Sequence, residues 1–81
     1  MTINVKLFAI LREKAGTAEI SIEVASGATV ARAVSALTER RPELAAWIGR
    51  AAFAVNLARV DGTMILNEGD ELALLPPVSG G

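Results

Sequence analysis

The last six residues of the sequence have the composition of a carrier of reactive chemistry. They read Pro76-Pro77-Val78-Ser79-Gly80-Gly81. Prolines fix φ and lack an amide hydrogen, so we expect the pair to form a stiff, extended stalk. Glycines have no Cβ and adopt whatever φ and ψ a narrow channel imposes. We therefore expect the tip to enter another protein's active site, with Gly81 as a free C-terminus.

The chemistry available at such a tip is that of a carboxylate. An α-carboxylate has an ordinary pKa of about 3.5, so Gly81 ends in an anion at neutral pH. This anion can attack the α-phosphate of ATP, but it is not an acyl donor until another protein activates it. A frayed end or an expression remnant would also leave two terminal glycines. The rest of the chain decides between these interpretations.

Length and composition indicate one small globular domain. The chain has 81 residues, of which 52% are apolar and 21% charged, and its net charge is −1. A domain of this size buries roughly 60 to 65% of the surface that its unfolded chain exposes, so its packing must be efficient. The weak net charge and the small number of aromatic residues argue against nucleic-acid binding.

The chain contains neither Cys nor His. This excludes disulfides, zinc sites of the usual N/S type, thiol nucleophiles and the usual imidazole base. We therefore expect no metal site and no cofactor bound by this chain. An apolar run of about 18 residues and a signal-peptide pattern are both lacking, so we expect a cytoplasmic protein.

Hydrophobic periodicity predicts the elements of the first half. Apolar residues alternate from Ile3 to Leu11 and again from Ile20 to Val24, which predicts two strands. A turn over residues 12–16 should join them as a hairpin. An apolar stripe at i, i+3, i+4 and i+7 from Val30 predicts an amphipathic helix, capped by Thr29 and ending near Arg41.

The second half reads as short elements separated by turns. Pro42 to Gly49 is expected to form a helical turn in which Trp47 covers the core, with a binding role for this aromatic as the alternative. The remaining elements are a β run at 52–56, turns at 60–63 and 67–70, an unassigned segment at 64–66 and a last strand at 71–75. The expected core consists of Ile3, Val5, Leu7, Ile20, Ile22, Val24, Val30, Val34, Leu37, Leu72 and Leu74.

This order of elements predicts an α+β fold. Two strands, a helix and returning strands require a crossover, and a right-handed crossover places the last strand parallel to and beside the first. The result is a β-grasp, or ubiquitin-like, mixed sheet packed against one main helix. We expect residues 1–75 to form this domain and residues 76–81 to form a flexible tail.

Several short motifs carry a resemblance to a known family. They are Phe8-Ala9, Arg12-Glu13, Gly16, Ala54-Val55-Asn56, Glu68-Gly69-Asp70-Glu71 and the six-residue ending. Together they resemble the small subunit of molybdopterin synthase, the MoaD type, over nearly the whole chain. Sulfur carriers of the thiazole (ThiS type) and cysteine pathways share the fold and the terminal glycines, while the double proline favours the molybdopterin member. The family commonly has an aromatic before the prolines, where this chain has Leu74 and Leu75.

The resemblance implies a role for the tail. An E1-like adenylating enzyme (MoeB type) would use ATP to form the Gly81 acyl-adenylate, and a sulfur donor would displace AMP to leave a thiocarboxylate. In a heterotetramer with the large synthase subunit (MoaE type), this sulfur would build the dithiolene of molybdopterin from cyclic pyranopterin monophosphate. The acid, base and phosphate-binding groups are then expected on the large subunit. This chain would donate sulfur without being the catalyst.

Three other functions are compatible with the same fold, so the fold cannot separate them. The chain can be a sulfur carrier of another pathway, such as thiamine thiazole, cysteine or tRNA thiolation. It can be a covalent modifier attached to lysines through Gly81. It can also be a plain β-grasp interaction module whose terminal glycines are incidental.

A docking surface for the partners is expected on the face of the sheet without the helix. Strict alternation puts Phe8 and Ile10 of the first strand on this face, together with Ala73 and Leu75 of the last. These four residues would form one apolar patch at the root of the tail, although Phe8 could simply shield the sheet. Arg12, in the expected turn, is a candidate contact for the activating enzyme, with a solvated turn charge as the alternative.

Overall fold

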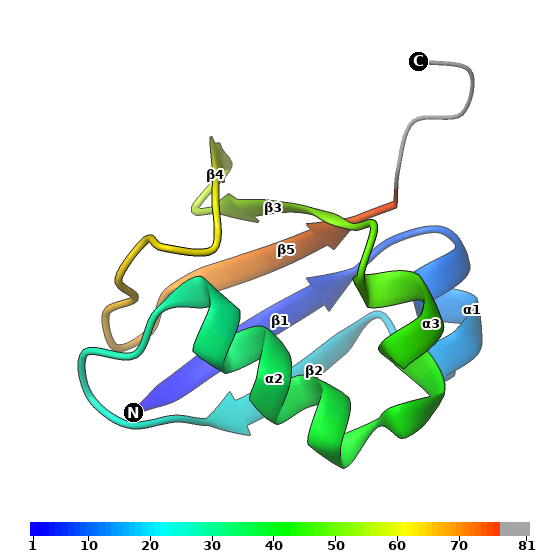
Figure 1. Cartoon of the computed structure of the whole chain (residues 1–81), viewed down its shortest axis with the longest axis horizontal. Helices are drawn as coiled ribbons and strands as arrows, with labels where there is room; N and C mark the ends of the chain where they lie inside the picture. The colour runs from blue at the N-terminus through cyan, green and yellow to red at the C-terminus, as the bar shows by residue number, and fades with distance from the viewer. Residues whose placement is uncertain (77–81) are drawn as a thin grey trace.

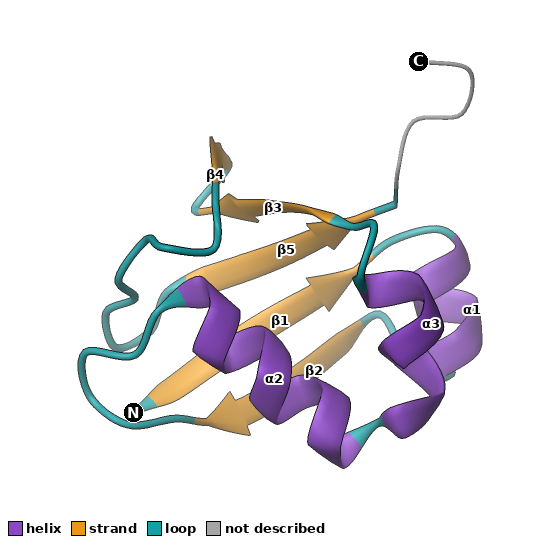
Figure 2. Cartoon of the chain, viewed as in Figure 1, coloured by secondary structure: helices purple, strands orange, loops and turns teal. Residues whose placement is uncertain are grey.

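The chain folds into a five-stranded mixed sheet with its helices on one face (Figure 1). A computed structural model describes residues 1–76 of the 81. The elements are β1 (Thr2–Leu7), α1 (Ile10–Ala15), β2 (Glu19–Glu23), α2 (Val30–Arg40), the 3₁₀ turn η1 (Pro42–Leu44), α3 (Ala45–Ile48), β3 (Ala52–Val55), β4 (Ala58–Val60) and β5 (Glu71–Leu75). Figure 2 shows α2 crossing the sheet, while α1 and α3 gather near the end where β1 and β5 finish.

The strand order confirms the predicted β-grasp arrangement. The order is β2-β1-β5-β3-β4, with β1 antiparallel to β2 and parallel to β5. The last strand therefore lies beside the first, as the crossover rule predicts. Strand β3 pairs antiparallel with both β5 and β4. The sheet is thus mixed, and β5 occupies its centre.

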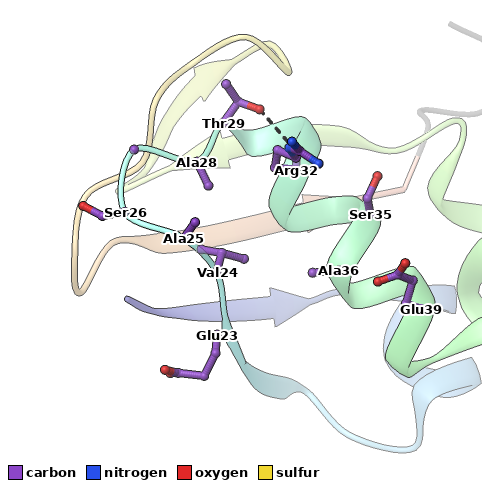
Figure 3. Close-up of a pocket in the computed structure, with 11 residues that line it drawn as sticks. Glu23, Val24, Ala25, Ser26, Ala28, Thr29, Arg32, Ser35, Ala36 and Glu39 are labelled. Atoms are coloured by element: carbon purple, nitrogen blue, oxygen red, sulfur yellow. Dashed lines mark hydrogen bonds between the residues drawn. The ribbon is translucent and has the colours of Figure 1, made fainter.

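The main helix forms for the reasons that the sequence indicates. The Thr29 hydroxyl accepts a hydrogen bond from the Arg32 amide at 3.2 Å, which satisfies one of the free donors of the first turn (Figure 3). Val30, Ala33 and Leu37 are completely buried, so the apolar stripe faces the sheet. Pro42 begins the next turn, because its ring cannot continue the α2 hydrogen-bonding pattern.

The core lies between α2 and the sheet. All expected core residues are buried except Val24 and Val34, which are partly buried and pack against the others. The core also contains Leu11, Ala15, Ala33, Leu44, Ile48, Val55 and Leu66. Three of the segments that supply these residues, α1, η1 and α3, cover the end of the sheet from which β5 leaves.

The first predicted strand is too long, and the turn predicted after it is wrong. The strand ends at Leu7, and residues 10–15 form α1. Ala9 has a φ of 50° and turns the chain out of the sheet, so the side-chain alternation stops there. Leu11 and Ala15, four residues apart, are buried on one side of α1, and Gly16 ends it in the left-handed conformation. Strands β1 and β2 pair as predicted, but a helix joins them.

A second strand-turn-strand unit was not predicted. Strand β4 pairs with β3 through a turn at Asn56 and Leu57, which have φ values of 48° and 72°. Two successive positive φ values are typical of a type I′ hairpin turn, in which Asn is favoured and Leu is not. Leu57 is also 94% exposed. In the unassigned segment at 64–66, Leu66 is buried and Ile65 bridges to Thr29.

No helix within residues 1–76 is long and apolar enough to cross a membrane. The longest helix, α2, has 11 residues. A membrane-spanning helix needs about 20 apolar residues.

Replacing Leu37 by Ala should lower the free energy of unfolding by about 2 to 5 kcal/mol. Leu37 is completely buried between α2 and the sheet, so its truncation loses apolar burial and leaves a cavity. Urea denaturation followed by circular dichroism measures the loss. Ser35→Ala, at an exposed position of the same helix, is the matched control. A loss below about 1 kcal/mol for Leu37→Ala would contradict the assigned helix face.

Candidate functional site

The root of the tail is fixed by the centre of the sheet. Strand β5 pairs with β1 on one side and β3 on the other, and it ends at Leu75. Pro76 follows directly and is half-buried. The predicted tail residues Pro77, Val78, Ser79, Gly80 and Gly81 lie outside the described residues. The predictions for these five residues therefore stay predictions.

The start of β5 is held by a buried carboxylate. Asp70 is only 9% exposed, and its two carboxylate oxygens accept hydrogen bonds from the Asn56 side-chain amide at 3.0 Å and from the Asn67 backbone amide at 2.8 Å. The Asn56 side-chain oxygen accepts in turn from the Glu71 amide at 3.1 Å. These contacts join the turn before β5 to the turn after β3. The prediction that Asp70 is a turn residue is confirmed.

An apolar surface lies on the helix-free face beside the tail root. We call it the sheet patch, and it consists of Ala52, Ala54, Ala73 and Leu75, with Phe8 assigned to it because the preceding residue, Leu7, is buried on the opposite face. The strand register pairs Leu75 with Ala52 and Ala73 with Ala54, opposite the buried positions of β5. Phe8 directly follows β1 and is 41% exposed. The two β3 alanines were not among the predicted residues, although the alternation from Ala52 to Val55 would have revealed them.

The other two predicted contact residues do not lie on this sheet face. Ile10 belongs to α1, where it is half-buried and packs against the core, so its assignment to the patch was wrong. The reason is the turn at Ala9, which sends the chain from β1 into a helix. Arg12 lies on α1 and is exposed. It remains a candidate contact, now on a helix rather than in a turn.

A groove opens on the other side of the tail root. We call it the tail-root groove, and it is lined by Ile10, Leu11, Ala46, Trp47, Arg50 and Pro76, with a volume of about 320 Å³. Trp47 is 39% exposed, so it forms a wall of this groove instead of filling the core as an anchor. Its neighbour Ile48 takes the buried position in α3. The Lys14 ammonium lies 5.3 Å from the centre of the Trp47 ring, within the range of a cation–π contact.

A larger cleft lies away from the tail. Its volume is about 660 Å³, and it is formed by the segment after β2 and one side of α2. Figure 3 shows Arg32, Ser35 and Glu39 on the helical side and Glu23 on the strand side. Figure 1 shows the segment between β2 and α2 at the opposite end of the sheet from the end of β5. Pro76 is not among the residues that line it.

The charges near the tail root do not form a catalytic constellation. Lys6 and Glu71 pair across β1 and β5 at 3.5 Å on the helix-free face, and both are partly exposed. Farther away, the hydroxyl and amide of Thr63 bond to the carboxylate of Asp61 and hold its pKa below the usual value. Within residues 1–76, no cluster of three acidic side chains is arranged to hold a metal ion.

Comparison with protein-family models gives one family. The model of the ThiS family matches residues 5–81, which include the whole tail. Among curated relatives, the molybdopterin synthase sulfur carrier subunit of Arabidopsis thaliana is 33% identical over 98% of this chain and 82% of its own length. The match thus covers both the sheet and the ending.

Two further relatives differ in the roles that their names state. Small archaeal modifier protein 1 of Haloferax volcanii is 40% identical over 94% of this chain and 97% of its own. Its crystal structure aligns with a TM-score of 0.89 over all of both chains, at 35% identity. A complex of subunits 1 and 2 of the molybdopterin-converting factor of Helicobacter pylori contains a chain that aligns with a TM-score of 0.73, at 27% identity and full coverage of both chains.

Replacing Asp70 by Ala should destabilise the fold by about 1 to 3 kcal/mol. The change removes the buried carboxylate that accepts partly buried hydrogen bonds from the Asn67 amide and the Asn56 side chain. Asp61→Ala is the control, because that carboxylate also accepts bonds from its own turn but is fully exposed. Thermal unfolding of both variants measures the difference. Equal losses would mean that the Asp70 network does not hold the start of β5.

Proposed function

The chain belongs to the ThiS family of ubiquitin-like sulfur carriers, and we propose that it is the small subunit of molybdopterin synthase. The observation that carries this proposal is the family match up to Gly81, combined with a tail root fixed between β1 and β3. Relatives named as sulfur carrier subunits of that synthase support the choice of pathway. We expect the protein to act in the cytoplasm.

The proposed chemistry takes place at the carboxylate of Gly81. A carboxylate oxygen attacks the α-phosphate of ATP on an adenylating enzyme, and pyrophosphate leaves. A sulfur donor then displaces AMP and leaves a thiocarboxylate. The terminal sulfur is transferred to cyclic pyranopterin monophosphate in two successive rounds, and each round returns a carboxylate at Gly81. ATP thus enters the cycle on the activating enzyme.

The residues of this chain would contribute position and docking. Strand β5 sets the direction in which the tail leaves, and the sheet patch supplies an apolar surface beside that exit. We propose that the large synthase subunit and the adenylating enzyme dock in turn on the sheet patch. The Helicobacter pylori complex of subunits 1 and 2 of the molybdopterin-converting factor supports an assembly with two kinds of subunit. In the assembly that we propose for this chain, the large subunit supplies the acid, the base and the phosphate-binding groups.

A second candidate function is covalent protein modification. The haloarchaeal relative, named as a modifier protein, favours it and has the highest identity of the relatives described above. Mass spectrometry of the intact protein purified from cells distinguishes the two functions. Replacement of one oxygen by sulfur at the C-terminus is expected for the carrier, whereas conjugates of higher mass are expected for the modifier. Finding neither species would favour a plain interaction module.

Deleting Gly81, or extending the chain beyond it, should abolish sulfur transfer. Deletion leaves a terminal carboxylate one residue short of the site where it is adenylated. Extension converts the Gly81 carboxylate into a peptide amide, which cannot be adenylated. Thermal stability should change little, because the tip lies beyond the sheet that forms the domain. The measurement is thiocarboxylate formation with the adenylating enzyme and a sulfur source, alongside a melting curve. Full activity in an extended and uncleaved chain would overturn the carrier proposal.

Replacing Phe8 by Ala should weaken association with the large subunit at least roughly thirtyfold. Truncating a central aromatic contact typically costs about 2 kcal/mol or more in binding. Phe8 is partly exposed, so the domain should stay folded. Ile65→Ala, an exposed apolar position outside the sheet patch, is the control. Calorimetric titration measures the affinity, and an unchanged value in the folded Phe8 variant would remove the patch from the mechanism.

A further inference from the structure

Strand β2 is an outer strand of the sheet, and within residues 1–76 it pairs with β1 alone (Figure 1). One residue beyond β2, the Val24 amide donates to the Met1 carbonyl at 2.9 Å. Backbone groups alternate in direction along an antiparallel strand, so the even-numbered residues of β2 bond to β1. The backbone N–H and C=O groups of the odd-numbered residues therefore point away from the sheet. These residues are Glu19, Ser21 and Glu23.

Two side chains occupy part of this outer edge. The Thr17 hydroxyl donates to the Glu19 carbonyl at 3.1 Å and accepts from the Glu19 amide at 3.4 Å. The Arg40 guanidinium, from the last turn of α2, donates to the Ser21 carbonyl at 3.1 Å. Unpaired N–H and C=O groups at a sheet edge are a template for another strand. The two side chains thus occupy backbone groups that an added strand would need.

The sequence of this edge is self-complementary. Strand β2 reads Glu-Ile-Ser-Ile-Glu, which is the same in both directions. In an antiparallel pair of two β2 strands centred on Ser21, this residue faces its own copy, and Ile20 faces Ile22 of the second copy. Both isoleucines are buried on the helical side of the sheet. The junction would therefore keep apolar side chains on one face and polar side chains on the other.

The same pairing places carboxylates opposite one another. Glu19 would face Glu23 of the second copy, and the two-fold symmetry would repeat this pair. Both carboxylates are held on the helix-free face by side chains of β1, because Glu19 accepts from the Asn4 amide at 2.6 Å and Glu23 accepts from the Thr2 hydroxyl. Like charges directly opposite each other destabilise a strand pair. The charges therefore add a second barrier to the hydrogen bonds that occupy the edge.

We propose that the outer edge of β2 is a pairing surface for a second copy of this chain, and that Arg40 and Thr17 hold it closed. The palindromic sequence supplies the register, and the bonds to Ser21 and Glu19 block the backbone groups that this register uses. Arg40 is exposed, so its side chain can be removed without opening the core. This inference goes beyond the proposed function, because it concerns an edge that β1 separates from β5 and does not depend on which pathway uses the tail.

Sedimentation of the full-length protein over a range of concentrations tests the closed edge. Thr17→Val combined with Arg40→Ala frees the outer groups of β2 and should convert a monomer into a concentration-dependent dimer. Adding Glu23→Gln removes one charge from each carboxylate pair and should tighten the dimer roughly two- to thirtyfold. Arg32→Ala, the same change at another exposed arginine of α2, is the control and should leave the protein monomeric. A double variant that is folded and stays monomeric would overturn the proposal.

Hydrogen exchange of the same samples locates the contact. The Ser21 amide faces the free edge, and pairing with a second copy should slow its exchange at least roughly tenfold in the variant dimer. The Ile22 amide bonds to β1 in both states and is the internal reference. A dimer in which Ser21 exchange is unchanged would place the contact elsewhere and overturn the proposal. Circular dichroism verifies the fold of each variant, and Arg40→Ala alone replaces the double variant if the latter does not fold.

Discussion

The structure depends on the position of β5 at the centre of the sheet. This strand forms hydrogen-bonded ladders on both sides, and its inward residues Leu72 and Leu74 are completely buried. Moving its register by one residue would expose both leucines and bury the outward positions, so the pairing is strongly specified. The place where the chain leaves the domain is specified with it. A tail that begins at Pro76 therefore starts from one of the most constrained points of the fold.

The division of the sheet into two faces follows from the same strand. The helices cover one face, and its apolar side chains supply the core, whereas the other face keeps small and partly exposed residues such as Ala73 and Leu75. Because β5 is paired on both edges, it presents no unpaired backbone groups to another strand, and only its outward side chains are accessible. The free face can then serve another molecule without loosening the core. This separation suits the docking that we propose for the sheet patch.

The sequence predicts most of the fold because its longest patterns are local and regular. Alternation identifies β2 and β5, and the stripe and cap identify α2, since each pattern reports directly which face is buried. Two features escaped prediction for a physical reason. The alternation from Ile3 to Leu11 continues through Ala9, where the backbone takes a φ of 50° that alanine does not favour, so nothing in the residue types marks the turn. The sequence does not predict the turn at Asn56 and Leu57 for the same reason, because leucine is unusual at the positive φ that this turn requires.

The turn at Ala9 also relates the two surfaces beside the tail. It lies between Phe8, which belongs to the sheet patch, and Ile10, which lines the tail-root groove. A strand that continued would place these two side chains on the same face, whereas the turn sends the second one to the helical side. A non-glycine residue in such a conformation costs about 1 to 3 kcal/mol, which the surrounding packing must offset. The buried contacts of Leu7 and Leu11, on either side of the turn, provide that compensation and keep both surfaces at fixed positions relative to Pro76.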